Sequence, residues 1–159
     1  FLPVLAFALG IALAEIVHKK DLNLLHWRQA AVLVEALILI GVAFFPQNMN
    51  LLANSLTSFA CGIQVESFRK IRGNGIATTM CIGNMRSGTQ NLCNYLQDRD
   101  IENLKKALLY YGIIICFICG AIVGNLFIKI FAEKAILCCS ALLFFAFTLM
   151  FIDYEREKE

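Results

Sequence analysis

The chain has 159 residues, of which 59% are apolar and 16% charged, and its mean hydropathy is +0.69. Soluble proteins average about 45–50% apolar and about 25% charged residues, so this composition argues against an ordinary soluble domain and indicates an integral membrane protein. The net charge of +2 is small and scattered over polar loops, which argues against nucleic-acid binding. We therefore expect the lipid bilayer as a partner and no nucleic acid.

The chain opens at Phe1 inside an apolar run, without Met and without a basic leader. Since a signal peptide would begin with basic residues, we expect the chain to be the C-terminal part of a longer protein. The first span is predicted at 1–17, which crosses most of a hydrocarbon core of roughly 30 Å. Gly10 belongs to a face of small residues spaced by four, and this spacing predicts a close helix contact.

Two further spans are predicted at 29–45 and 49–68, where apolar runs are flanked by polar or basic residues. Glu35 lies well inside the first of these two runs. An ionisable group at such a position is either a neutral carboxyl that faces the helix bundle or a proton-coupling residue. The sequence leaves both interpretations open.

A glycine-punctuated polar insertion runs from Gly62 to Asn91 and interrupts the apolar runs. Its part from Ile76 to Leu96 has the length of a helix but carries too many polar side chains to face lipid. It therefore either crosses the membrane inside the bundle or enters and returns on the same side as a re-entrant helix. The re-entrant version places most of the Lys and Arg residues on one side, and the positive-inside rule favours it with a cytoplasmic C-terminus.

The last two spans are predicted at 105–129 and 135–152, and Asp100 is expected to cap the first of these helices. Within that helix Gly120 and Gly124 form a GxxxG helix-contact motif. The glycines predicted to pack helices together are Gly10, Gly112, Gly120 and Gly124.

The seven cysteines lie mostly inside apolar runs, where they act as small packing residues. Cys116 and Cys119 have the spacing of a redox pair but lack the flanking pattern of a soluble redox domain. The sequence shows no nucleophile paired with a base, no set of metal ligands and no phosphate-binding loop. We therefore predict no enzyme activity, no metal site and no cofactor.

A weak internal repeat relates residues 7–14 to residues 117–124. Such a relation is typical of transporters built from two related halves. The predicted divisions are the end of a first membrane repeat at 1–46, a complete second repeat at 48–152 and a charged tail at 153–159. The predicted fold is an all-α polytopic membrane helix bundle with five spanning helices, one polar re-entrant or broken helix, and internal repeats.

The central stretch contains five distinctive runs: Phe59-Ala-Cys-Gly-Ile-Gln64, Ser67-Phe-Arg-Lys70, Arg72-Gly-Asn74, Ala77-Thr-Thr-Met-Cys81 and Gly83-Asn-Met-Arg-Ser-Gly-Thr89. They resemble the YoaK family of bacterial integral membrane proteins, and the resemblance covers mainly the second half of that family's length. It implies a multi-pass protein of the bacterial inner membrane with two related halves and without a settled biochemical activity. Glu66 and Ile82 depart from the family pattern, which has a small polar residue and a threonine there. If that threonine hydroxyl binds a ligand, this chain has lost it.

Two functions remain open. The first is a transporter or facilitator of an unknown small solute, in which Arg86 offers a bidentate donor to an anion and, with Asn84, faces a polar cavity inside the bundle. The second is a non-transporting membrane protein that docks a partner or anionic lipid through Arg69, Lys70 and Arg72. The residues assigned to the solute site are Gln64, Glu66, Thr78, Thr79, Gly83, Asn84, Arg86 and Gln90. The oligomeric state is not predicted.

Overall fold

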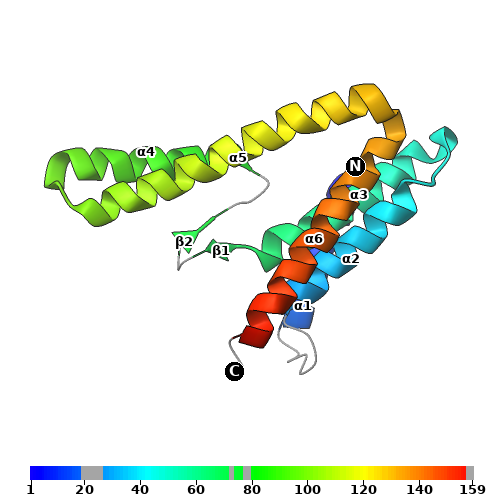
Figure 1. The fold of residues 1–159 in the computed structure, drawn as a ribbon, viewed down its shortest axis with the longest axis horizontal. Coiled ribbons are helices and arrows are strands. Elements are labelled where there is room, and N and C mark those ends of the chain that lie inside the picture. Colours follow the sequence, from blue (N-terminus) through cyan, green and yellow to red (C-terminus); the bar gives the residue numbers. More distant parts are fainter. Residues whose placement is uncertain (19–26, 72–73, 77–79, 157–159) are drawn as a thin grey trace. The chain divides into compact units, whose positions relative to one another are not determined.

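The structure, a computed structural model, describes residues 1–18, 27–71, 74–76 and 80–156 (Figure 1). Most of these residues are helical, so the prediction of an all-α fold is confirmed. The described helices are α1 (Leu2–His18), α2 (Trp27–Val42), α3 (Asn50–Ser67), α4 (Cys81–Asp98), α5 (Ile101–Phe131) and α6 (Ala135–Arg156), with short 3-10 turns at Gln47–Met49 and Ala132–Lys134.

The described chain divides into two compact units. The first unit contains Phe1–Ser67 and Ile128–Glu159, and the second contains Phe68–Phe127. The two units are defined by contacts between residues in space, whereas the repeats are predicted from similarity of sequence. The two predicted repeats, 1–46 and 48–152, therefore remain a prediction.

Each of the five predicted spans corresponds to a helix, but five membrane crossings are not confirmed. Helix α5 has 31 residues, and its most apolar window of 18 residues has a mean hydropathy of 2.4. Within the described ranges it is the helix that is long and apolar enough to cross a membrane. Helix α1 and the part of α6 from Ala135 to Met150 are apolar but shorter. This pattern is compatible with a membrane protein.

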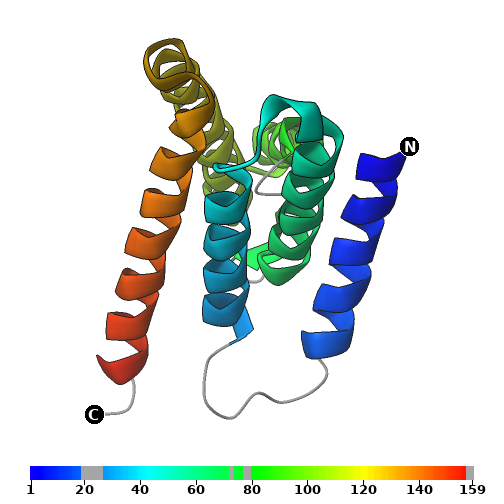
Figure 2. The ribbon, with the colours of Figure 1, turned by 90° about the vertical axis from the view of Figure 1, so that its right-hand side faces the viewer.

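The first unit is a bundle of α1, α2, α3 and α6. Figure 2 shows that α1, α3 and α6 run in one direction and that α2 runs in the opposite direction. Its small apolar core joins Ala14 of α1, Ala31 of α2 and Ile63 of α3, with Trp27 and Phe59 packed against them. Small side chains at these positions let the helix axes approach closely, which increases the van der Waals contact between helices.

Helices α1 and α3 cross at two glycines that occupy equivalent positions in a short repeat. The sequence Phe-Ala-Leu-Gly-Ile at 7–11 recurs as Phe-Ala-Cys-Gly-Ile at 59–63. A Cβ atom on Gly10 would lie 2.2 Å from the carbonyl oxygen of Phe59, and one on Gly62 would lie 2.3 Å from the carbonyl oxygen of Phe7. Each glycine lacks a Cβ and so allows the backbone of the other helix to approach closely. Because the two helices run in the same direction, the two contacts are equivalent.

The second unit begins with a short antiparallel ladder between β1 (Lys70–Ile71) and β2 (Asn74–Gly75). The N–H of Ile76 then donates to the carbonyl oxygen of Arg69, at 2.9 Å, and the Ile76 side chain is buried. Helix α4 therefore starts at Cys81 rather than at Ile76 and continues to Asp98 instead of Leu96. The predicted start is wrong because the Asn-Gly pair favours a turn and the N–H of Ile76 bonds to the neighbouring strand rather than within a helix.

Candidate functional site

Helices α4 and α5 form a tight antiparallel hairpin. Arg99 ends α4 in the left-handed region, with φ of 54°, and its N–H donates to the carbonyl oxygen of Tyr95 at 2.9 Å. Asp100 then caps α5, since its Oδ1 accepts the N–H of Glu102 at 3.0 Å. This bond confirms the predicted N-cap, and the short turn brings the two helices side by side (Figure 1).

The face of α4 that packs on α5 is formed by Asn84 and Gly88. Asn84 is 3% exposed, and Gly88 is also buried. A Cβ on Gly88 would lie 3.2 Å from the Cβ of Tyr110, so the glycine allows the two helices to approach closely. Next to Gly88 along the chain, Thr89 shares a hydrogen bond of 3.0 Å with Tyr111 between their hydroxyl oxygens.

Tyr110 also ties the short strand ladder to α5. Its hydroxyl donates to the carbonyl oxygen of Gly75 at 3.0 Å, and the ring is 7% exposed. A single tyrosine thus packs against Gly88 on one element and bonds to Gly75 on another. It fixes the segment before α4 against the same stretch of α5 that holds α4.

The structure divides the predicted site residues among several places. Asn84 is buried one turn before Gly88 on α4, whereas Gly83, Arg86 and Gln90 lie on the exposed side of α4. Gln64 and Glu66 belong to α3, in the first unit, and both are partly buried. The predicted ligands Thr78 and Thr79 lie outside the described residues.

The side chain of Arg86 is exposed in the described chain, and its position at a polar cavity inside the bundle remains a prediction. The physical reason for the exposure is the helical period. Arg86 follows Asn84 by two positions, about 200° around the helix, so burying one of these side chains against α5 turns the other away. The same geometry groups Arg86 with Gln90, one turn later.

The bundle of the first unit holds two buried polar side chains on α2. The Nε2 of Gln29 donates to the carbonyl oxygen of Met150 on α6 at 2.7 Å, and the side chain is 2% exposed. Glu35 is 8% exposed. Gln29 is not among the predicted site residues. Its position one turn before Val32, on the apolar face of the helix, is the sequence feature that indicates a buried side chain.

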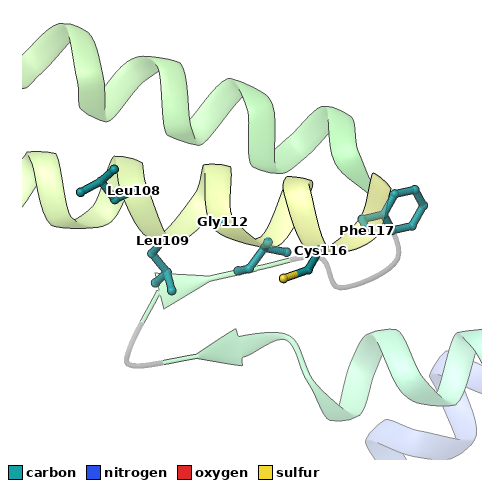
Figure 3. A pocket seen from close by; sticks show the side chains of 6 residues that line it. Leu108, Leu109, Gly112, Cys116 and Phe117 are labelled. Carbon is teal, nitrogen blue, oxygen red and sulfur yellow. The ribbon is translucent and has the colours of Figure 1, made fainter. Parts of the chain in front are cut away.

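The glycines predicted to pack α5 lie in open space within the described chain. No atom of the described residues comes within 4 Å of a Cβ built on Gly112, Gly120 or Gly124. Gly112 lines an apolar groove of about 530 Å³ along α5, and Figure 3 shows its lining side chains. The groove residues are Leu108, Leu109, Gly112, Ile113, Cys116 and Phe117.

The described residues contain no group of three or more His, Cys, Asp or Glu side chains that could hold a metal ion. All seven cysteines are free thiols, and Cys116 and Cys119 are both exposed on α5. The arrangement therefore offers buried amides, hydroxyls and a carboxyl rather than a redox or metal centre in the part of the chain described.

Comparison with protein-family models shows the family of this chain. A family model described as a protein of unknown function, DUF1275, matches residues 1–149. No curated protein and no solved structure matches the chain. The matched region covers nearly the whole sequence, so the chain belongs to the DUF1275 family. The narrower resemblance to the YoaK family is compatible with this result and remains a prediction.

Proposed function

We propose that this DUF1275 protein is an integral membrane transporter or facilitator of a small solute, and that its solute path runs along the hairpin of α4 and α5. The observation that carries the proposal is the position of Asn84, a buried amide on a polar helix that packs against the apolar helix α5. Polar helices and irregular backbone are tolerated at membrane depth where they are covered by protein or line a water-filled cavity. Such an arrangement is typical of solute paths.

The register of the hairpin supports a re-entrant position of α4. Gly88 lies beside Tyr110, and the two helices are antiparallel. From Gly88 back to Cys81 the helix rises by about 10 Å at 1.5 Å per residue, and the same rise along α5 leads from Tyr110 to Phe117. Phe117 is halfway along the apolar part of α5, 107–128. If α5 spans the membrane, α4 begins near the midplane and returns to the side where α5 starts, as a re-entrant helix.

This placement supplies polar groups at the depth where a solute path needs them. Gly83, Asn84 and Arg86 all fall within the first two turns of α4. An arginine at this depth costs at least about 2.5–3.5 kcal/mol unless it meets water or an acceptor. In the proposal, the Arg86 side chain therefore lies in a water-filled path. Because its side chain is exposed, anion selectivity has no support in the structure, and the proposed solute has no assigned charge.

The test is solute uptake by the full-length protein in proteoliposomes, with an unbiased mixture of metabolites. We expect uptake of at least one solute by the parent protein and its loss in Asn84→Ala. Gln97→Ala is the matched control, because Gln97 is an exposed amide at the far end of the same helix. Absence of any uptake, or equal uptake by the two variants, would contradict the proposal.

Binding of the protein to vesicles that carry anionic lipid separates this proposal from the alternative of lipid docking. The alternative depends on Arg69, Lys70 and Arg72, of which the structure describes the exposed side chain of Arg69. If Arg69→Ala abolishes vesicle binding while no solute is transported, docking becomes the better proposal.

A further inference from the structure

Glu35 is a buried carboxyl in the middle of an apolar helix. It lies near the centre of α2 and is 8% exposed. Its Oε2 atom is buried and has no hydrogen-bond partner among the described residues. Ala31, Ala36 and Leu39 around it on the same helix are buried and apolar, so α2 itself offers the carboxyl no side-chain partner.

Helices α1 and α3 also present apolar residues at this level. Ala31 lies one turn before Glu35 and belongs to the cluster with Ala14 and Ile63. Since α2 runs opposite to α1 and α3 (Figure 2), moving one turn along α2 corresponds to moving back about four residues on each neighbour. That step leads to Gly10 on α1 and Phe59 on α3, neither of which has a side-chain hydrogen-bonding group.

Charged groups lie at other levels of the bundle. The rise of 1.5 Å per residue places Glu15 of α1 about 7 Å along the bundle axis from the level of Glu35. Glu66 of α3 and Arg28 of α2 each lie about 10 Å from that level. All three residues are displaced toward the end of the bundle where α2 begins. His18, the last residue of α1, lies beyond Glu15. The described part of α6 from Ala135 to Met150 contains no ionisable side chain other than cysteine. Among the described residues, the carboxyl of Glu35 thus has no opposite charge at its own depth.

We propose that Glu35 is a proton-binding site of the transport cycle. An ionised carboxylate in an apolar interior is expensive unless it is paired and hydrogen-bonded, and the described residues offer the Oε2 atom of Glu35 no such partner. In the arrangement described here the group holds its proton as a neutral acid. When the bundle rearranges and water reaches α2, the O–H bond breaks, the proton leaves to water and the carboxylate remains. The coupling to solute rests on the proposed function, whereas proton binding by Glu35 does not.

Carbodiimide labelling of the wild-type protein in proteoliposomes tests proton binding directly. Dicyclohexylcarbodiimide is apolar and reacts with a protonated carboxyl. The acid gives its proton to the reagent, a carboxylate oxygen adds to the central carbon, and rearrangement leaves a stable N-acylurea. We expect this adduct on Glu35, found by peptide mass spectrometry, and much less on Glu102, an exposed carboxylate at the start of α5.

The pH dependence of labelling separates a titrating site from a permanently neutral one. Labelling of Glu35 should fall by about tenfold per pH unit once the group ionises. Absence of the adduct on Glu35 at every pH, labelling no greater than that of Glu102, or labelling that never changes with pH would overturn the proposal. This result needs no variant and no known solute, so it stands or falls independently of the transport assay.

Glu35→Gln tests the coupling, because glutamine mimics the neutral acid and cannot release a proton. Its melting temperature in detergent should stay close to that of the wild type. If a solute is transported, uptake by wild type should depend on an imposed pH gradient, and uptake by Glu35→Gln should not. Equal dependence on the gradient in both proteins would remove Glu35 from the coupling, and uptake by wild type that ignores the gradient would do the same.

Discussion

Gly10 and Gly62 occupy equivalent places in α1 and α3, and each glycine faces the main chain of the helix that carries the other. A Cβ on Gly10 would lie 2.2 Å from the carbonyl oxygen of Phe59, and a Cβ on Gly62 would lie 2.3 Å from that of Phe7. These distances are shorter than any real contact of a Cβ atom with a carbonyl oxygen. The helices must therefore separate if either glycine acquires a side chain.

Gly10→Ala and Gly62→Ala should each destabilise the protein by about 1–3 kcal/mol, because the added methyl group displaces a backbone rather than a flexible side chain. Gly41→Ala is the control, since no described atom lies within 4 Å of a Cβ at that position and alanine is the better helix former by about 1 kcal/mol. Thermal unfolding in detergent measures the difference. Equal melting temperatures for the three variants would contradict the crossing.

Gly120→Leu gives opposite expectations from sequence and from structure. The GxxxG motif predicts a helix contact and hence a loss of about 1–3 kcal/mol. Outside the backbone of α5 itself, the structure places no described atom within 4 Å of a Cβ on Gly120, which predicts no loss and a gain of up to about 1 kcal/mol, because leucine is a better helix former than glycine. Thermal unfolding of this variant beside Gly10→Ala decides between them. A loss as large as that of Gly10→Ala would show that α5 has a contact beyond those seen here.

Tyr110→Phe should loosen the segment before α4 without unfolding the protein. The change removes the hydrogen bond to the carbonyl oxygen of Gly75, and such bonds contribute about 0.5–1.5 kcal/mol. Hydrogen exchange of the amides from Asn74 to Ile76 should accelerate by a corresponding factor of roughly 2–13. Tyr111→Phe, which removes the bond to Thr89, is the control and should leave these amides unchanged.

Cysteine accessibility tests the re-entrant placement of α4. In a variant without native cysteines, Arg69→Cys and Asp98→Cys should react with a membrane-impermeant thiol reagent from the same side, and Lys129→Cys from the other. The reason is that a re-entrant α4 returns the chain to its starting side before α5 crosses. Reaction of Arg69→Cys and Asp98→Cys from opposite sides would mean that the segment spans.

The described helices show how much the sequence determines. Apolar runs and polar breaks predict where α1, α2, α3, α5 and α6 lie, because lipid or a protein core requires such runs and their ends require polar residues. The cap at Asp100 also follows from sequence, since it depends on atoms two residues apart. Local chemistry fixes features of this kind.

The choice of helix partners could not be predicted in the same way. The small residues of α1 and α5 predict close contacts equally well, yet the structure pairs Gly10 with the helix of Gly62 and leaves Gly120 open within the described chain. The repeat of Phe-Ala-x-Gly-Ile at 7–11 and 59–63 is a signal that marks this pairing. The predicted repeat instead relates 7–14 to 117–124, where the similarity is weaker.

Some features of the candidate site likewise follow from the sequence, and others depend on helix packing. The presence of a polar helix within an apolar chain, and of a carboxyl within an apolar run at Glu35, follows from the sequence alone. The burial of Asn84, the exposure of Arg86 and the burial of the apolar α2 residues around Glu35 became evident from the folded structure. The reason is that composition and helical period fix which residues share a face, whereas the burial of that face depends on packing between segments distant in the sequence.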